Sequence, residues 1–149
     1  WNQGGHLTTT QQCTAQDVWH DRAPAVGKNG TYSAWLNNNA SVDYVLHHNI
    51  LYPNQPYMQL EMFVPHAPTS PGPPLEYIVP PFTHLTPQDN TRKNYSGMVA
   101  SFDQAIANVT MALQTTDMWA NTLMVVFGDN GGAVPDGGRI WPLRGCKWS

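Results

Sequence analysis

The sequence has 149 residues, of which 41% are hydrophobic, 11% aromatic and only 11% charged, with a formal net charge of −3 at pH 7. This length favours a single domain, and the acidic balance excludes a basic surface for nucleic acid or an anionic membrane. No apolar run approaches the about 20 residues that a membrane-spanning helix needs. We therefore expect no nucleic-acid partner and no membrane span.

Two stretches show the periodicity of helices, whereas residues 1–30 are polar, contain several glycines and read as irregular structure. Residues 31–49 have a rough apolar face. Residues 91–117 give the clearer signal, an apolar stripe with spacings of three and four residues. The stripe consists of Tyr95, Met98, Val99, Phe102, Ile106, Val109 and Leu113.

Two further stretches are expected to be strands. Residues 57–64 follow two prolines, and residues 122–128 form a short apolar run rich in β-branched side chains, typical of a strand covered on both faces. A long proline-rich connection, to about residue 90, separates the first strand from the second helix. Strand, helix and strand in this order predict a right-handed βαβ unit with parallel strands.

Polar side chains follow both expected strands. His66 comes after the first strand, and Asp129 and Asn130 come after the second. Because parallel strands end at the same edge of a sheet, the three residues are expected to converge there. Asp129 and Asn130 offer the hard oxygens that Ca²⁺ or Mg²⁺ prefers. Their alternative role is to form an Asx-turn that closes the strand, but the shared edge favours a metal site.

The glycine-rich loop that follows is basic. Arg139, Arg144 and Lys147 lie in it, and only Asp136 is close enough in sequence to offset them. Cations beside a metal site suit an oxyanion substrate. The alternative is an ordinary solvated basic loop.

Four Asn-x-Ser/Thr sequons are present, at Asn29, Asn39, Asn94 and Asn108. Four such sequons in a chain so poor in charge predict a glycoprotein of the secretory pathway, either secreted to the extracellular space or lysosomal.

The two cysteines, Cys13 and Cys146, lie far apart and fit no metal-ligand spacing. They can pair with each other or with cysteines outside this stretch, and the sequence leaves both alternatives open.

With these residues in view, the chain resembles the type I sulfatases of the alkaline-phosphatase-like superfamily, and most closely the arylsulfatase B group, which acts on sulfated N-acetylgalactosamine. The resemblance is densest in three blocks: residues 64–68, residues 95–110, and residues 129–132 together with 141–149. The third block is the most specific, because spacing, order and residue type agree there together.

The resemblance implies an α/β fold, a sheet sandwiched by helices, of which this chain holds only part: the central βαβ unit with its loops. It also implies a formylglycine nucleophile, made from the cysteine of a Cys-x-Pro-x-Arg motif, and a Ca²⁺ ion. Asp129 and Asn130 correspond to two calcium ligands. His66 corresponds to a catalytic residue near the leaving oxygen and Lys147 to one near the sulfate oxygens.

The sequence departs from the family pattern in ways that limit what this stretch does alone. Around Cys13 the motif is absent, because Ala15 replaces its proline and Asp17 its arginine. Cys146 stands where relatives usually carry arginine. We therefore expect residues 1–149 to be the central part of a sulfatase catalytic domain, without the N-terminal nucleophile segment and the C-terminal segment. Such a piece is inactive alone and needs the remainder of its own polypeptide.

Three functions follow from different premises. The first is a sulfuric ester hydrolase that removes sulfate from a glycan or an aryl sulfate. The second is a catalytically inactive sulfatase-fold glycoprotein with a structural or sulfated-glycan-binding role. The third is a phosphoester hydrolase of the wider superfamily, with a Ser or Thr nucleophile and two metals.

Overall fold

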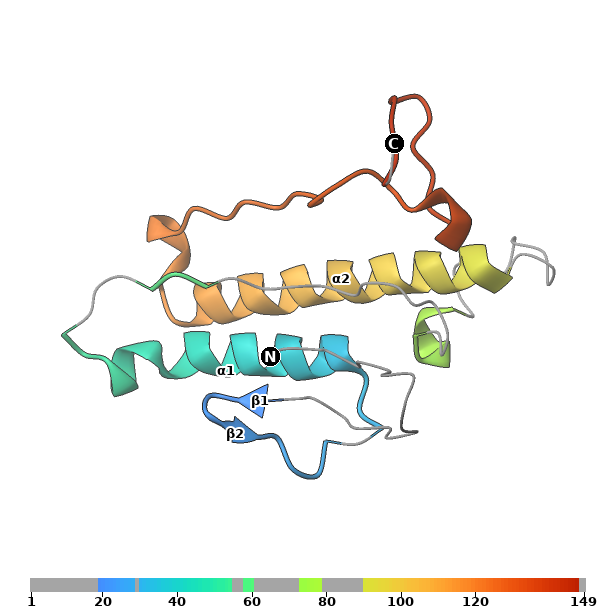
Figure 1. Ribbon diagram of the computed structural model, residues 1–149. Coiled ribbons are helices and arrows are strands. Elements are labelled where there is room, and N and C mark those ends of the chain that lie inside the picture. Colours follow the sequence, from blue (N-terminus) through green and yellow to red (C-terminus); the bar gives the residue numbers. More distant parts are fainter. Residues whose placement is uncertain (1–18, 29, 55–57, 61–72, 79–89, 148–149) are drawn as a thin grey trace. The chain divides into compact units, whose positions relative to one another are not determined.

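The structure is a computed structural model that describes residues 19–28, 30–54, 58–60, 73–78 and 90–147 (Figure 1). The chain divides into two compact units, Trp1–Thr31 and Tyr32–Ser149. Within the described ranges, no helix combines the length and the apolar character that crossing a membrane requires.

The described part of the first unit contains a short hairpin where the sequence predicted irregular structure. Strand β1 (Trp19–His20) pairs antiparallel with β2 (Ala23–Pro24), with Trp19 opposite Pro24. Asp21, in the connection, has a φ of 54°. Aspartate tolerates this left-handed conformation better than most residues, which makes so tight a turn possible.

The second unit is built on two helices, α1 (Ser33–Leu51) and α2 (Asn90–Thr115). Both predicted helices are thereby confirmed, with ends within two residues of those expected. The helices lie side by side and run in the same direction (Figure 1). Neighbouring helices on one face of a parallel sheet have this relationship, because the chain returns along the sheet between them.

Small and polar side chains dominate the buried face of each helix. Residues of α1 are buried at alternating spacings of four and three: Ala34, Asn38, Ser41, Val45 and His48. On α2 the buried positions include Met98, Ser101, Ala105, Val109 and Ala112. The apolar stripe predicted for α2 is therefore correct in period but shifted in part, because Val99 is exposed while Ser101 and Ala105 are buried. Small side chains permit the close approach of two helices, a role that hydrophobicity alone does not reveal.

The apolar core lies between the C-terminal halves of the helices. Val45 is completely buried and packs with Val109, Ala112 and Leu113. Partly buried side chains complete the cluster, one from α1 (Val42) and four from the connecting segments (Met58, Leu60, Met118 and Met124). Burial of an aliphatic side chain of this size contributes about 1.5–3 kcal/mol.

A Schellman motif ends α2. Asp117 adopts the left-handed conformation, with a φ of 57°. The amide of Met118 donates to the carbonyl of Leu113 at 2.9 Å, and that of Asp117 to Gln114 at 3.3 Å. Met118 and Leu113 also meet in the core, the apolar contact that commonly accompanies this cap. The cap turns the chain back along the helices.

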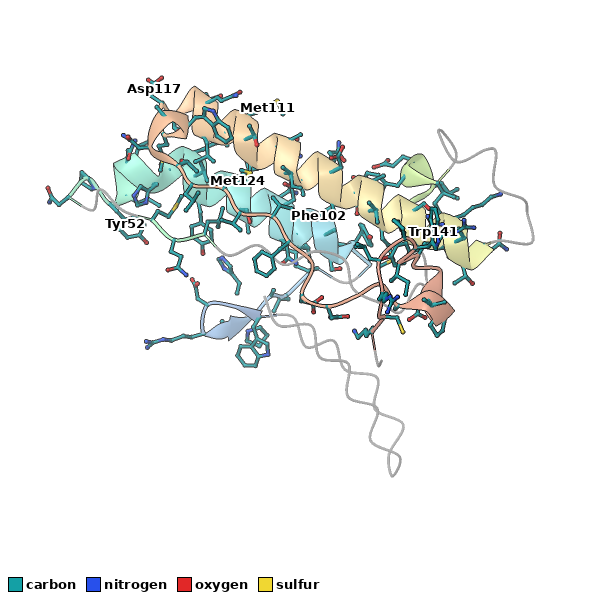
Figure 2. All side chains as sticks on the ribbon, turned by 90° about the horizontal axis from the view of Figure 1, so that it is seen from above. Tyr52, Phe102, Met111, Asp117, Met124 and Trp141 are labelled. Atoms are coloured by element: carbon teal, nitrogen blue, oxygen red, sulfur yellow. The ribbon has the colours of Figure 1, made fainter. Side chains whose placement is uncertain are left out.

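Residues 122–128 are extended, but the expectation of a strand buried on both faces is wrong for this chain as described. Val125 is 66% exposed and Phe127 77% exposed. The only strand pairing in the described ranges is that of β1 with β2. Met124 alone reaches the core from this segment (Figure 2). A strand acquires its hydrogen bonds and its cover from neighbours, and no described segment supplies them here.

The other expected strand, residues 57–64, is described only at residues 58–60. Met58 and Leu60 pack against the core while Gln59 between them is exposed, an alternation with the period of a strand. The remaining residues of that stretch lie outside the described ranges, so the parallel pairing of the βαβ unit stays a prediction.

Candidate functional site

The site is organised by the loop that follows residues 122–128. Asp129, Asn130 and Gly131 form a bend, and a short 3-10 turn, η4 (Val134–Asp136), comes next. The amide of Gly138 donates to the carbonyl of Ala133 at 2.9 Å and closes this turn on itself. Residues 129–147 are called the site loop below.

The far end of the site loop returns to its beginning. The amide of Lys147 donates to the carbonyl of Gly132 at 3.4 Å. A Cβ atom on Gly131 would lie only 3.0 Å from the Cα of Cys146, so the two backbones touch. The structure therefore brings Lys147 next to the turn that holds Asp129 and Asn130, as a shared site requires.

The start of α2 supports the site loop. Gly137 has a φ of 90°, and a Cβ atom on it would lie 2.9 Å from the carbonyl oxygen of Thr91. One guanidinium nitrogen of Arg92 donates to the carbonyl of Gly137. The loop is thus fixed to a regular element.

The donor chemistry of the turn fits a hard cation. Asp129 and Asn130 are both exposed, and neither side chain forms a hydrogen bond or ion pair with any described residue. A carboxylate and an amide oxygen are ligands that Ca²⁺ takes, but the ion needs about six to eight. No group of three or more His, Cys, Asp or Glu side chains with metal-binding geometry occurs among the described residues. Further ligands would have to come from elsewhere in the polypeptide.

Positive charge gathers around the site loop. Five of the seven lysines and arginines of the chain lie in α2's first turn or in the loop: Arg92, Lys93, Arg139, Arg144 and Lys147. Arg92 and Lys93 were not predicted from the sequence to lie near the site. Their position was an available sign of a special role, because cations are disfavoured in the first turn of a helix, where the dipole is positive.

His66 lies outside the described residues, as do Cys13 and Asn29. The expected convergence of His66 with Asp129 and Asn130 therefore stays a prediction, and so does the pairing of the cysteines. Cys146 is half-buried beside Gly131.

The three remaining sequons all lie on helices, Asn39 on α1 and Asn94 and Asn108 on α2. In the first two, the hydroxyl residues Ser41 and Ser96 are buried. Residues two apart on a helix point about 200° apart, so a buried serine directs its asparagine outward. Asn39 is accordingly exposed.

The described residues of the second unit thus contain two parallel helices, a segment that returns along them and a loop that carries both acidic and basic side chains (Figure 1). Residues 21–145 match the sequence profile of the family described as Sulfatase. The chain belongs to the sulfatase family, whose fold is the alkaline-phosphatase-like α/β fold. The resemblance to the type I sulfatases that the sequence indicated is thereby confirmed.

A named relative agrees with this assignment. Arylsulfatase J of the mouse, Mus musculus, is 34% identical over 129 residues, which cover 78% of this chain and 21% of that protein. The chain thus spans about a fifth of the length of this relative.

Proposed function

We propose that the complete polypeptide hydrolyses sulfate esters, of a glycan or of an aryl alcohol, and that the chain described here supplies part of the active site. The observation that carries the proposal is the hydrogen bond between the amide of Lys147 and the carbonyl of Gly132. It brings the backbone of Lys147 next to the turn that contains Asp129 and Asn130, and this supports the proposal in a chain of the sulfatase family.

In this proposal Asp129 and Asn130 hold a Ca²⁺ ion and Lys147 contacts the sulfate oxygens. The ion and a formylglycine on another segment supply a Lewis acid and a nucleophile when present. The Lys147 ammonium stabilises the negative charge that increases on the sulfate oxygens during transfer, and it is worth most in a site closed to water. His66 delivers a proton to the leaving oxygen.

Residues 1–149 form the central part of a catalytic domain, and the nucleophile segment and other calcium ligands belong to the remainder of the same polypeptide. The sequons support passage through the secretory pathway to the extracellular space or the lysosome, with glycans on the helical surface.

The proposal is tested by Asn130→Ala in the complete polypeptide, assayed on an aryl sulfate over a range of Ca²⁺ concentrations. Loss of a calcium ligand is expected to lower kcat/KM by about 10²-fold or more, and excess Ca²⁺ should restore part of it. Asn121→Ala is the matched control, because Asn121 is also exposed but lies in the turn η3 (Trp119–Asn121), after the end of α2. Equal activity of both variants and the wild type would reject the metal assignment.

A second candidate is a catalytically inactive glycoprotein that keeps the fold and binds sulfated glycans. Cys146, which stands where relatives usually carry arginine, favours it. A peptide map of the complete polypeptide separates the two functions. Formylglycine supports the enzyme, whereas an unmodified nucleophile segment together with retained binding of a sulfated glycan supports the inactive protein.

A further inference from the structure

The site loop is attached to the helical part of the unit at a few identifiable points, and Arg92 provides the most specific of them. Its Nη1 atom donates to the carbonyl oxygen of Gly137 at 2.5 Å. Its guanidinium carbon also lies 5.7 Å from the centre of the Tyr95 ring, within the range of a cation–π contact. Tyr95 thus helps to fix the side chain that reaches the loop.

Gly137, which accepts this hydrogen bond, has no room for a side chain. Gly137 occupies the left-handed region, where a residue with a side chain would be strained. A Cβ atom there would also lie 3.0 Å from the Cα of Arg92 and 3.1 Å from its amide nitrogen. The loop backbone therefore sits directly on the first turn of α2, and Arg92 donates to it across this close contact.

Backbone contacts connect Gly137 to the turn that contains the proposed calcium ligands. Gly138, the next residue, donates to Ala133 at 2.9 Å, and Gly132, just before Ala133, accepts from Lys147 at 3.4 Å. Each of these links joins backbone atoms, so a shift of residue 137 displaces the whole arrangement. Asp129 and Asn130 lie immediately before Gly131, which touches Cys146.

An arginine in the first turn of a helix is energetically unfavourable unless another interaction compensates the cost. The dipole disfavours a cation there, and the first turn of α2 contains no acidic residue that would offset it. The carbonyl of Gly137 offers the guanidinium a charge-assisted hydrogen bond that compensates this cost.

We propose that Arg92 is a positioning residue: it holds the site loop so that Lys147 stays beside the turn of Asp129 and Asn130. Its catalytic consequence rests on the proposed function, whereas the attachment itself does not. Arg92 touches neither the proposed metal nor the sulfate in this arrangement, and acts through the loop.

The test compares Arg92→Gln with Lys93→Gln in the complete polypeptide. Both variants remove one positive charge from the same helical turn, but Arg92 alone of the two donates to the site loop. Hydrogen–deuterium exchange is followed for residues 131–147, with residues 105–115 of α2 as an internal reference, and kcat and KM are measured on an aryl sulfate.

Arg92→Gln is expected to raise the exchange of the site loop about tenfold, with the reference peptide unchanged, because it removes a charge-assisted hydrogen bond. It should lower kcat by a similar factor, whereas Lys93→Gln changes only KM, through the weaker attraction of an anionic substrate. Arg92→Lys keeps the charge with a less specific donor and should fall between the wild type and Arg92→Gln.

Equal effects of Arg92→Gln and Lys93→Gln would overturn the proposal, since charge alone would then explain both. A loss of stability with uniform exchange across α2 and the loop would also overturn it, because Arg92 would be merely structural. If the wild type shows no sulfatase activity, the proposed function fails, and the exchange comparison still decides whether Arg92 holds the loop.

Discussion

The indole N–H of Trp35 donates a hydrogen bond to the hydroxyl of Tyr77 at 2.9 Å, although the two residues lie 42 positions apart. The Tyr77 hydroxyl in turn donates to the side-chain oxygen of Gln104. This relay joins α1, the short turn η1 (Leu75–Tyr77) and α2. It explains why residues 73–78 lie close enough to α2 to touch its glycine.

Gly97→Ala is expected to destabilise the protein by about 1–2 kcal/mol. Helix propensity alone would favour alanine by about 1 kcal/mol. Here the new Cβ atom would lie 2.8 Å from Cγ of Pro73 and 3.2 Å from the carbonyl oxygen of Tyr77, and overpacking typically costs more. Urea unfolding measures the change. Ala107→Gly, on the exposed side of α2, calibrates propensity, and a stabilised Gly97→Ala variant would contradict the close approach.

Val45→Ala should lower the free energy of unfolding by about 2–3 kcal/mol, because Val45 is completely buried between the helices. Val99→Ala removes the same atoms from an exposed position of α2 and should change stability by no more than about 0.5 kcal/mol. Chemical denaturation of both variants gives the comparison. Similar losses at the two positions would mean that the core is placed wrongly.

We expect Tyr32 to make the protein less stable at alkaline pH. Burial raises the pKa of its hydroxyl above the usual 10.0; the nearby Ser101 hydroxyl lowers this pKa in part, and the neighbouring Tyr77 raises it further. As pH rises above 10.0, the unfolded chain loses this proton while the folded one keeps it, so stability falls up to the folded pKa.

Tyr32→Phe isolates this effect. The Tyr32 hydroxyl is buried without a well-formed hydrogen bond to a described residue, and Ser101 donates instead to the carbonyl of Met98 at 2.8 Å. Loss of this hydroxyl should leave stability at neutral pH unchanged or raise it by up to about 1 kcal/mol. Unfolding followed from about pH 9 to 11 should decline less in the variant. Parallel declines would exclude Tyr32 as the source.

Lys147→Ala should lower kcat/KM on an aryl sulfate by about 10²-fold or more, because it removes a cation proposed to contact the sulfate oxygens. Arg144→Ala, in the same loop and more exposed, should change it by no more than about threefold. The two are compared in the complete polypeptide. If Arg144→Ala is the more damaging change, the sulfate lies at a different part of the site loop.

Asn39→Gln and Ser41→Ala should each remove one glycan, seen as the same mobility shift that enzymatic deglycosylation then abolishes. Only Ser41→Ala should also lower stability, because Ser41 is buried between the helices whereas Asn39 is exposed. The absence of a shift in both variants would show that this sequon is not used.

The sequence was sufficient to predict the two helices, and it is also the basis on which the residues of the site are proposed. The period of three and four along α2 located the helix, and Asp129, Asn130 and Lys147 are proposed as site residues because their side chains suit a cation and an oxyanion. These features depend on local periodicity and on the chemistry of individual side chains, so neighbouring residues are enough to predict them.

The tertiary structure alone decided which side of each helix is buried, and what supports the loop. Ser101 and Ala105 are buried because they let a second helix come close, a property that no hydrophobicity scale assigns to them. Arg92 meets Gly137 only because the chain doubles back on α2. Residues 122–128 had the composition of a buried strand, yet remain exposed, since burial depends on neighbouring segments and not on the run itself.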